Sequence, residues 1–175
     1  MENQNTKINN YLQRINYNKP PVLSRETLDE LQACHYESVP YENFDILDNK
    51  PLSLEIDDLY EKIVVKNRGG YCFELNELYG WLLKSLGYTV CDYLSRFLYK
   101  EPSIPMRRHH VLVAEVDGER LLCDVGVGAE APRKTLLLQE EIIQEDGLRL
   151  YKTEKDDELG WVLSVHYKDE WKRLY

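Results

Sequence analysis

The sequence contains, at residues 68–76, the segment Arg68-Gly69-Gly70-Tyr71-Cys72-Phe73-Glu74-Leu75-Asn76. From Leu75 onward, apolar residues recur every three or four positions, which is the spacing of one helical face: Leu75, Leu78, Tyr79, Leu82 and Leu86. Gly87 ends this pattern, and the glycine pair before Cys72 permits a tight turn that a residue with a Cβ would resist. We therefore expect a buried helix that begins near Cys72.

Cys72 is a candidate nucleophile because of this position. Unpaired amides at a helix start, together with the helix dipole, favour a thiolate over a thiol, and the thiolate is the reactive form. Arg68 would add positive charge nearby. The alternative is an inert cysteine, since free cysteine often packs in protein cores as a small apolar residue.

Composition indicates an ordinary globular protein of 175 residues, 43% apolar and 30% charged. This length suits one domain, or two small domains that share a core. A formal net charge of −9 argues against a nucleic-acid partner. No apolar run approaches the roughly 18 residues of a membrane span, so we expect a cytoplasmic protein. The cysteines Cys34, Cys72, Cys91 and Cys123 form no C-x-x-C pair, which argues against a metal site or a disulfide framework.

The first half of the chain has helical patterns and the second half has strand patterns. Helical spacing covers residues 6–15 behind Thr6, a run after Ser24 and a run after Ser53, while residues 39–44 should be extended. Segments rich in aromatic and β-branched residues predict strands at 88–99, 109–116, 119–125, 135–139, 147–153, 159–166 and 170–175. The predicted fold class is α+β: an N-terminal helical bundle at 1–87 followed by an antiparallel β-barrel domain at 88–175. Because a strand pattern is still in progress at residue 175, we expect a truncated fragment.

The clearest hairpin signal is Asp117-Gly118, which is typical of a type I′ turn. In that case residues of the two strands whose numbers add to 235 face each other, and the oppositely charged Glu115 and Arg120 are one such pair. Alternation then places His109 and Asp124 on one face as diagonal neighbours and His110 on the other face. A bulge would exchange the two histidines.

Cys72, His109 and Asp124 together supply a nucleophile, a base and a carboxylate that orients the base, with His110 as the alternative base. Backbone amides near Cys72 and Phe73 are candidates for an oxyanion hole. Plainer interpretations exist for each partner. His109 could be a solvated strand-end residue, Asp124 a turn carboxylate bound by nearby amides, and His110 a hydrogen-bonded core residue.

These segments together resemble one known family, the arylamine N-acetyltransferases. Residues 68–76 resemble its nucleophile segment, and Val39-Pro40-Tyr41-Glu42-Asn43-Phe44-Asp45 resembles its upstream P-[FY]-E-N segment. His109, the apolar strand after it, the Asp-Gly turn and Asp124-Val125-Gly126-Val127-Gly128 resemble its histidine, its aspartate and its D-V-G-F-G loop. The three elements occur in the family's order and cover most of the chain.

The resemblance implies a helical bundle and a β-barrel with a Cys-His-Asp triad between them, as in cysteine peptidases. It implies ping-pong transfer of acetyl from acetyl-CoA, as donor substrate and without a metal, through Cys72 to an arylamine, hydrazine or N-hydroxyarylamine. Phe73 and Val127 would contact substrate. Two departures stand out. Val127 replaces the family's usual phenylalanine, which leaves more room in the amine pocket, and the sequence has no counterpart of the family's third, α/β lid domain.

Two other functions remain open at this point. The same triad in the same chain order serves hydrolases of the papain and transglutaminase types. A chain in which Cys72 is merely packed would be a non-catalytic binding domain.

Overall fold

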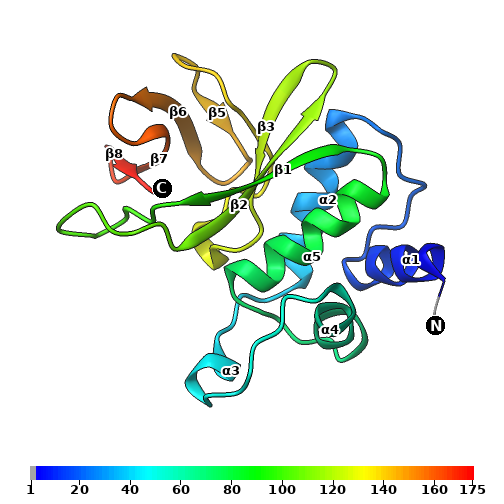
Figure 1. Cartoon of the computed structure of the whole chain (residues 1–175). Helices are drawn as coiled ribbons and strands as arrows, with labels where there is room; N and C mark the ends of the chain where they lie inside the picture. The colour runs from blue at the N-terminus through cyan, green and yellow to red at the C-terminus, as the bar shows by residue number, and fades with distance from the viewer. Residues whose placement is uncertain (1–2) are drawn as a thin grey trace.

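The computed structural model describes residues 3–175, and its helices precede its strands along the chain (Figure 1). The helical part comprises α1 (Gln4–Arg14), α2 (Arg25–Ser38), α3 (Phe44–Leu47), α4 (Ile56–Tyr60), the π-helical turn η1 (Glu61–Val65) and α5 (Cys72–Ser85). The strands are β1 (Thr89–Ser95), β2 (His109–Val116), β3 (Glu119–Cys123), β4 (Leu136–Leu137), β5 (Gln144–Glu145), β6 (Leu150–Asp156), β7 (Gly160–Tyr167) and β8 (Glu170–Arg173), with the 3-10 turn η2 (Gly128–Glu130) before β4. The α+β prediction is confirmed.

The helix starts match the capping predictions in part. Ser24 caps α2 as predicted, because its side-chain oxygen accepts a hydrogen bond from an N–H of the first turn. α1 begins earlier than expected, with Asn3 rather than Thr6 as its cap. α4 begins only at Ile56, and Ser53 bonds within the turn before it.

The strands of residues 3–175 form two antiparallel sheets, in the orders β1-β2-β3-β4 and β5-β6-β7-β8. β2 pairs with β3 in the predicted register, with Leu112 opposite Cys123 and Glu115 opposite Arg120. Asp117 and Gly118 have φ angles of 52° and 79°. A type I′ turn requires positive φ at both central positions, so the turn prediction is also confirmed.

The two sheets do not close into the predicted barrel, and side-chain hydrogen bonds explain why. The N–H of Leu137, in β4, donates to Oε1 of Gln144 at 2.7 Å, and Nε2 of Gln144 donates to the carbonyl of Leu137 at 2.9 Å. Thr153 Oγ1 donates to the same carbonyl at 3.2 Å. The backbone groups that a continuous ladder from β4 to β5 would use are therefore taken by side chains. The first sheet ends there.

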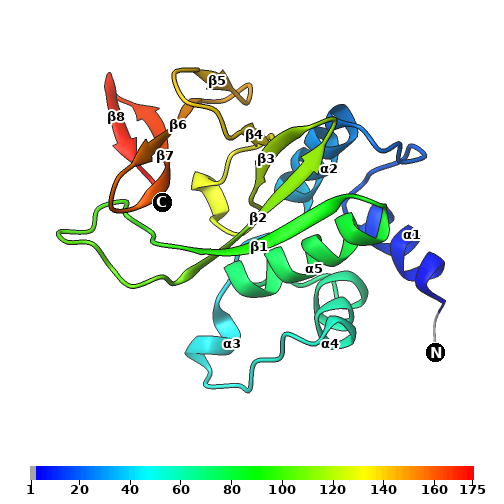
Figure 2. The ribbon, with the colours of Figure 1, turned by 45° about the horizontal axis from the view of Figure 1, so that its top comes forward.

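α5 lies along one face of the first sheet, and the second sheet lies apart from that helix (Figures 1 and 2). Leu112 and Leu121 belong to the large core shared with the helices, whereas Val111 and Leu122 belong to a smaller core shared with the second sheet. This division follows the alternation predicted for the hairpin. None of the helices in residues 3–175 has the length and hydropathy of a membrane span.

Candidate active site

Two glycines bring the start of α5 against the segment that follows α2. Gly70 forms an isolated parallel bridge with Tyr41, and the N–H of Glu42 donates to the carbonyl of Gly70 at 2.9 Å. A Cβ on Gly69 would lie 1.9 Å from the carbonyl oxygen of Pro40, so any other residue there would force the two segments apart. This close approach positions Cys72, the first residue of α5.

A network of charges holds the same junction. Glu74 accepts a hydrogen bond from the N–H of the cap residue at 3.1 Å, and its other oxygen lies 2.7 Å from Nζ of Lys62. Lys62 also binds Asp45 at 2.8 Å. Arg68 binds Glu42 at 2.7 Å and Asp45 at 3.0 Å. The charge of Arg68 is therefore neutralised by carboxylates, whereas the sequence suggested that it would support Cys72.

Cys72, His109 and Asp124 meet where the start of α5 packs against β2 and the loop that follows β3. Cys72 and His109 are buried, and Asp124 has no exposed surface. Nε2 of His109 lies 2.7 Å from Oδ2 of Asp124. The same ring is within hydrogen-bonding reach of the Cys72 sulfur, which lies 4.0 Å from the carbonyl oxygen of Arg108. The three residues singled out in the sequence are thus in contact.

The charge state of this group follows from its contacts. Burial alone would lower the pKa of His109, but the carboxylate of Asp124 and the sulfur of Cys72 outweigh burial and raise that pKa to about 10. Burial likewise opposes ionisation of Asp124, yet His109 and the hydrogen bond from Asn76 hold the pKa of Asp124 below its usual value. At neutral pH His109 is therefore an imidazolium beside a carboxylate, and it has a proton to donate.

His110 lies on the opposite face of β2, as the register predicted. Its Nε2 is 3.1 Å from Oδ1 of Asp92, and its ring stacks on that of Phe73 with centroids 5.8 Å apart. His110, Asp92 and Glu77 each offer one potential metal-ligand atom, and these atoms lie within 4.8 Å of one another. Nζ of Lys84 lies 2.8 Å from Asp92, so the lysine already neutralises the charge of this carboxylate.

Two side chains that hold Asp124, those of Asn76 and Gln32, were not predicted from the sequence. Asn76 donates to Oδ1 of Asp124 at 2.9 Å and accepts from the next backbone N–H at 3.0 Å. Its position one helical turn after Cys72 was the available signal, because such residues share a helix face. Gln32, from α2, accepts from the N–H of Asp124 at 3.2 Å and donates to the carbonyl of Pro132 at 2.8 Å. No local pattern points to Gln32, since these partners are 92 and 100 residues away.

Two aromatic rings shield His109 from water. The ring centroids of Tyr175 and Phe97 lie 4.9 Å and 6.1 Å from that of His109. Within residues 3–175 the Tyr175 hydroxyl makes no hydrogen bond of good geometry. Its pKa is nevertheless raised well above the usual value, first by burial and then by the nearby Asp124 carboxylate. These rings keep the His109–Asp124 pair in an environment of low polarity.

The loop after Asp124 passes Cys72 and then lines a cavity. A Cβ on Gly126 would lie 2.7 Å from Cα of Cys72, so only glycine allows this approach. Val127 lines a cavity of about 430 Å³ together with Tyr41, Val125 and Gly128. Phe73 is not among the lining residues of that cavity, and it contacts the rings of Tyr71 and His110 instead.

Comparison with known proteins places this site in a family. A family model described as N-acetyltransferase matches residues 24–175. The arylamine N-acetyltransferase of Escherichia coli (strain K12) is 32% identical to this chain over 171 residues, which are 96% of this chain and 60% of the relative. The chain belongs to the arylamine N-acetyltransferase family. The resemblance seen in the sequence is confirmed.

Solved structures of this family share the fold. The arylamine N-acetyltransferase from Salmonella typhimurium has a TM-score of 0.92 at 31% identity, over 97% of this chain and 62% of that chain. The Mycobacterium marinum arylamine N-acetyltransferase in complex with CoA has a TM-score of 0.89 at 33% identity, over 96% of this chain and 64% of that chain. The present chain thus spans about three fifths of the length of the curated relatives it matches.

Proposed function

We propose that this chain carries the acetyl-transfer site of an arylamine N-acetyltransferase, with acetyl-CoA as donor and an arylamine, hydrazine or N-hydroxyarylamine as acceptor. The observation that carries the proposal is the contact of Cys72, His109 and Asp124 in one buried group. Relatives support the substrates: one is named arylamine N-acetyltransferase / N-hydroxyarylamine O-acetyltransferase, and one structural neighbour holds CoA. In this proposal residues 1–87 form the domain of the nucleophile, and residues 88–175 form the domain of the histidine and the aspartate.

The first half-reaction loads Cys72. Its thiolate attacks the carbonyl carbon of the acetyl thioester, and backbone N–H groups of Cys72 and Phe73, at the start of α5, stabilise the resulting oxyanion. As the tetrahedral intermediate collapses, the bond between that carbon and the CoA sulfur breaks. The His109 imidazolium donates its proton to the departing sulfur. Cys72 is then an acetyl thioester, and His109 is a neutral base.

The second half-reaction transfers acetyl to the acceptor. The amine nitrogen attacks the thioester carbon, His109 removes a proton from that nitrogen, and Cys72 leaves as a thiolate. The hydrogen bond from Nε2 of His109 to Asp124 keeps the proton on Nε2. The other ring nitrogen is therefore free to exchange a proton with the substrate and with Cys72.

The acceptor binds in the cavity that Val127 and Tyr41 line, because this cavity adjoins the loop that passes Cys72. Valine offers less stacking surface than a phenylalanine and leaves the cavity wider. Bulky hydrazines should therefore be accepted as readily as flat arylamines, and Val127→Phe should shift the preference toward flat arylamines in a panel assayed with acetyl-CoA.

Intact-protein mass spectrometry tests the proposed reaction. Acetyl-CoA should add one acetyl group to Cys72, and the group should persist until an arylamine is added. Release to water at the same rate without amine would indicate a hydrolase instead, and absence of labelling would indicate a packed, unreactive cysteine. Cys72→Ala should abolish the label, whereas Cys91→Ala, at an exposed cysteine, is the matched control that keeps it.

Two neighbouring histidines on β2 provide a matched pair for the base. His109→Gln should slow loading of Cys72 by roughly a hundredfold to ten-thousandfold, which is the range of general acid–base contributions. His110→Gln should load Cys72 at a rate within about tenfold of that of the parent chain, because the loss of the contact between His110 and Asp92 affects Cys72 only through packing. The reverse outcome would assign the base to His110.

A further inference from the structure

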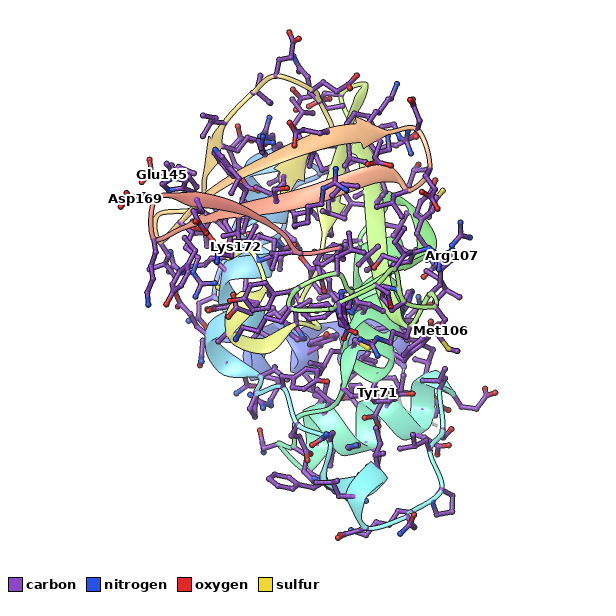
Figure 3. The ribbon with its side chains drawn as sticks, turned by 90° about the vertical axis from the view of Figure 1, so that its left-hand side faces the viewer. Tyr71, Met106, Arg107, Glu145, Asp169 and Lys172 are labelled. Carbon is purple, nitrogen blue, oxygen red and sulfur yellow. The ribbon has the colours of Figure 1, made fainter. Side chains whose placement is uncertain are left out.

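Three side chains that can bind a metal ion converge on the face of β2 opposite His109. Glu77 comes from α5, Asp92 from β1 and His110 from β2, and one potential ligand atom of each lies within 4.8 Å of the other two. Figure 2 shows β1 running over α5, and in Figure 3 the labelled Tyr71 marks the residue before this helix. The group joins one helix to two strands, so no local spacing in the sequence indicates it.

The strand register and a glycine of α5 bring these side chains together. Leu94 pairs with His110, so Asp92, two residues before Leu94, is a diagonal neighbour of His110 on the same face of the sheet. A Cβ on Gly80 would lie only 3.8 Å from Oδ1 of Asp92, which shows how closely α5 passes this face. Glu77 lies three residues before Gly80 and therefore on the same side of the helix.

The charges of this group are not balanced by the rest of the chain. Nζ of Lys84 lies 2.8 Å from Oδ2 of Asp92, whereas Oδ1 of Asp92 faces Nε2 of His110 at 3.1 Å. Glu77 is half-buried and has no hydrogen-bond or ion-pair partner within residues 3–175. One lysine is thus set against two carboxylates. A cation among the three ligand atoms would balance the second carboxylate, which is unfavourable to bury without a partner.

We propose that Glu77, Asp92 and His110 bind one divalent transition-metal ion of the zinc type. The donor set indicates this type, because an imidazole nitrogen with carboxylate oxygens suits zinc, whereas magnesium and calcium prefer oxygen ligands alone. Two ligand atoms about 2.1 Å from a tetrahedral ion lie roughly 3.4 Å apart. The 3.1 Å between His110 and Asp92 is close to this separation, and the longer side chain of Glu77 can rotate toward the ion.

Binding of the ion has a simple proton balance and a measurable effect on stability. The ion takes the place of the proton between Nε2 of His110 and Oδ1 of Asp92, and that proton is released to water. Lys84 can stay on the other oxygen of Asp92. Because the ion links α5 to β1 and β2, zinc at about 100 times its dissociation constant should raise Tm by roughly 5–10 °C. This binding requires no chemistry at Cys72, so it is a function in addition to acetyl transfer.

Calorimetric titration of the full chain with zinc chloride tests the proposal. The chain carries Cys72→Ala, because zinc also binds thiolates, and the result therefore does not depend on acetyl transfer. We expect one zinc ion per chain and no competition from magnesium. Cobalt(II) is a coloured substitute and should show d–d bands without a thiolate-to-metal charge-transfer band. Cys91→Ala should bind zinc unchanged, because strand alternation places Cys91 on the other face of β1 from Asp92.

Variants of the ligands complete the test. Glu77→Gln and Asp92→Asn change a half-buried and an exposed side chain, so the fold should persist. Each should weaken zinc binding at least tenfold, because loss of a residue that merely supports a ligand already costs about 10–100-fold. Lys84→Met should tighten zinc binding, because the ammonium group repels the ion. Glu115→Gln, at an exposed carboxylate elsewhere on β2, is the matched control and should have no effect.

Four results would overturn the proposal. They are the absence of zinc binding, competition by magnesium at the concentration of zinc, a thiolate charge-transfer band with cobalt, and a loss with Glu115→Gln as large as with Glu77→Gln. The second and fourth would indicate nonspecific attraction of cations to a chain with a net charge of −9. The third would place the ion at a cysteine.

Discussion

Replacing Asp124 by asparagine should keep the fold and remove most of the acetyl transfer, and the hydrogen bonds show why. Oδ1 of Asp124 accepts from Nδ2 of Asn76 at 2.9 Å and from the N–H of Gly126 at 2.8 Å. Both partners are donors, so the amide oxygen of an asparagine must take this position. Its NH₂ group must then face Nε2 of His109, which lies 2.7 Å from the other oxygen in the parent chain.

This orientation fixes the wrong form of the imidazole. Nε2 of His109 has to accept a hydrogen bond, and the proton moves to the other ring nitrogen, which can then no longer take a proton from Cys72 or the amine. An equivalent change in the serine-protease triad costs about 10⁴ in rate, which corresponds to about 5.4 kcal/mol of transition-state stabilisation. We expect a loss of that order for Asp124→Asn. The stability cost should be only about 1–2 kcal/mol, because every hydrogen bond keeps a partner.

The loss of rate is measured by single-turnover acetylation of Cys72, monitored by intact-protein mass spectrometry. The loss of stability is measured by urea unfolding. Asp146→Asn is the matched control, because Asp146 is also buried and its carboxylate accepts hydrogen bonds from three backbone N–H groups, those of Arg133, Leu148 and Arg149. It should lower stability and leave the acetylation rate of the folded protein unchanged. Acetylation of a folded Asp124→Asn variant within about tenfold of the parent rate would refute the tautomer argument.

Three further changes test other parts of the structure. Gly126→Ala should destabilise the chain by about 1–3 kcal/mol and slow loading of Cys72, because the new methyl group would lie 2.7 Å from Cα of Cys72. Urea unfolding measures the first effect and mass spectrometry of the acetylated protein measures the second. A variant with the stability and the loading rate of the parent chain would contradict the close approach of the two segments. Gln32→Met should lower the free energy of unfolding by about 2–4 kcal/mol, because it leaves the buried N–H of Asp124 and the buried carbonyl of Pro132 without a partner. These two groups lie at the ends of the loop that carries Val127, so the KM for the amine should also rise. Urea unfolding and steady-state kinetics measure the two effects, with Gln13→Met, at an exposed site on α1, as the control. His35→Phe should stabilise the chain by about 2 kcal/mol more at about pH 5 than at about pH 7.5. Burial lowers the pKa of His35 from 6.5 to about 3. Between these two pH values the unfolded chain binds a proton at His35 and the folded chain does not, so the free energy of unfolding of the parent chain decreases by about 1.4 kcal/mol for each unit by which the pH is lowered. Urea curves at the two pH values check this, and equal effects of the substitution at both would show that His35 titrates normally.

Much of the fold was predictable because the decisive signals are local. The apolar spacing after Cys72 predicts α5, since residues three and four apart share a helix face whatever surrounds them. The Asp117-Gly118 turn sets the register of β2 and β3, since a two-residue loop leaves one way to pair the strands, and the register brings His109 and Asp124 to one face. These elements, and the family they resemble, follow from the order of residues alone.

Other features depend on partners that are distant in the chain. The barrel stays open because a glutamine side chain, Gln144, takes the hydrogen bonds of Leu137, and no strand pattern shows which groups will compete for a backbone N–H. Arg68 lies beside Cys72 in sequence, but folding places it among carboxylates from other segments.

The sequence by itself determined which residues could form a nucleophile, a base and an orienting carboxylate, because residue type and local geometry decide that much. Only the tertiary structure decided how the group is held. Gln32 and Tyr175 reach the triad from opposite ends of the chain, and burial together with charge sets the proton on His109. Packing decides these properties, because electrostatic energies and hydrogen-bond partners depend on distances that no local pattern encodes.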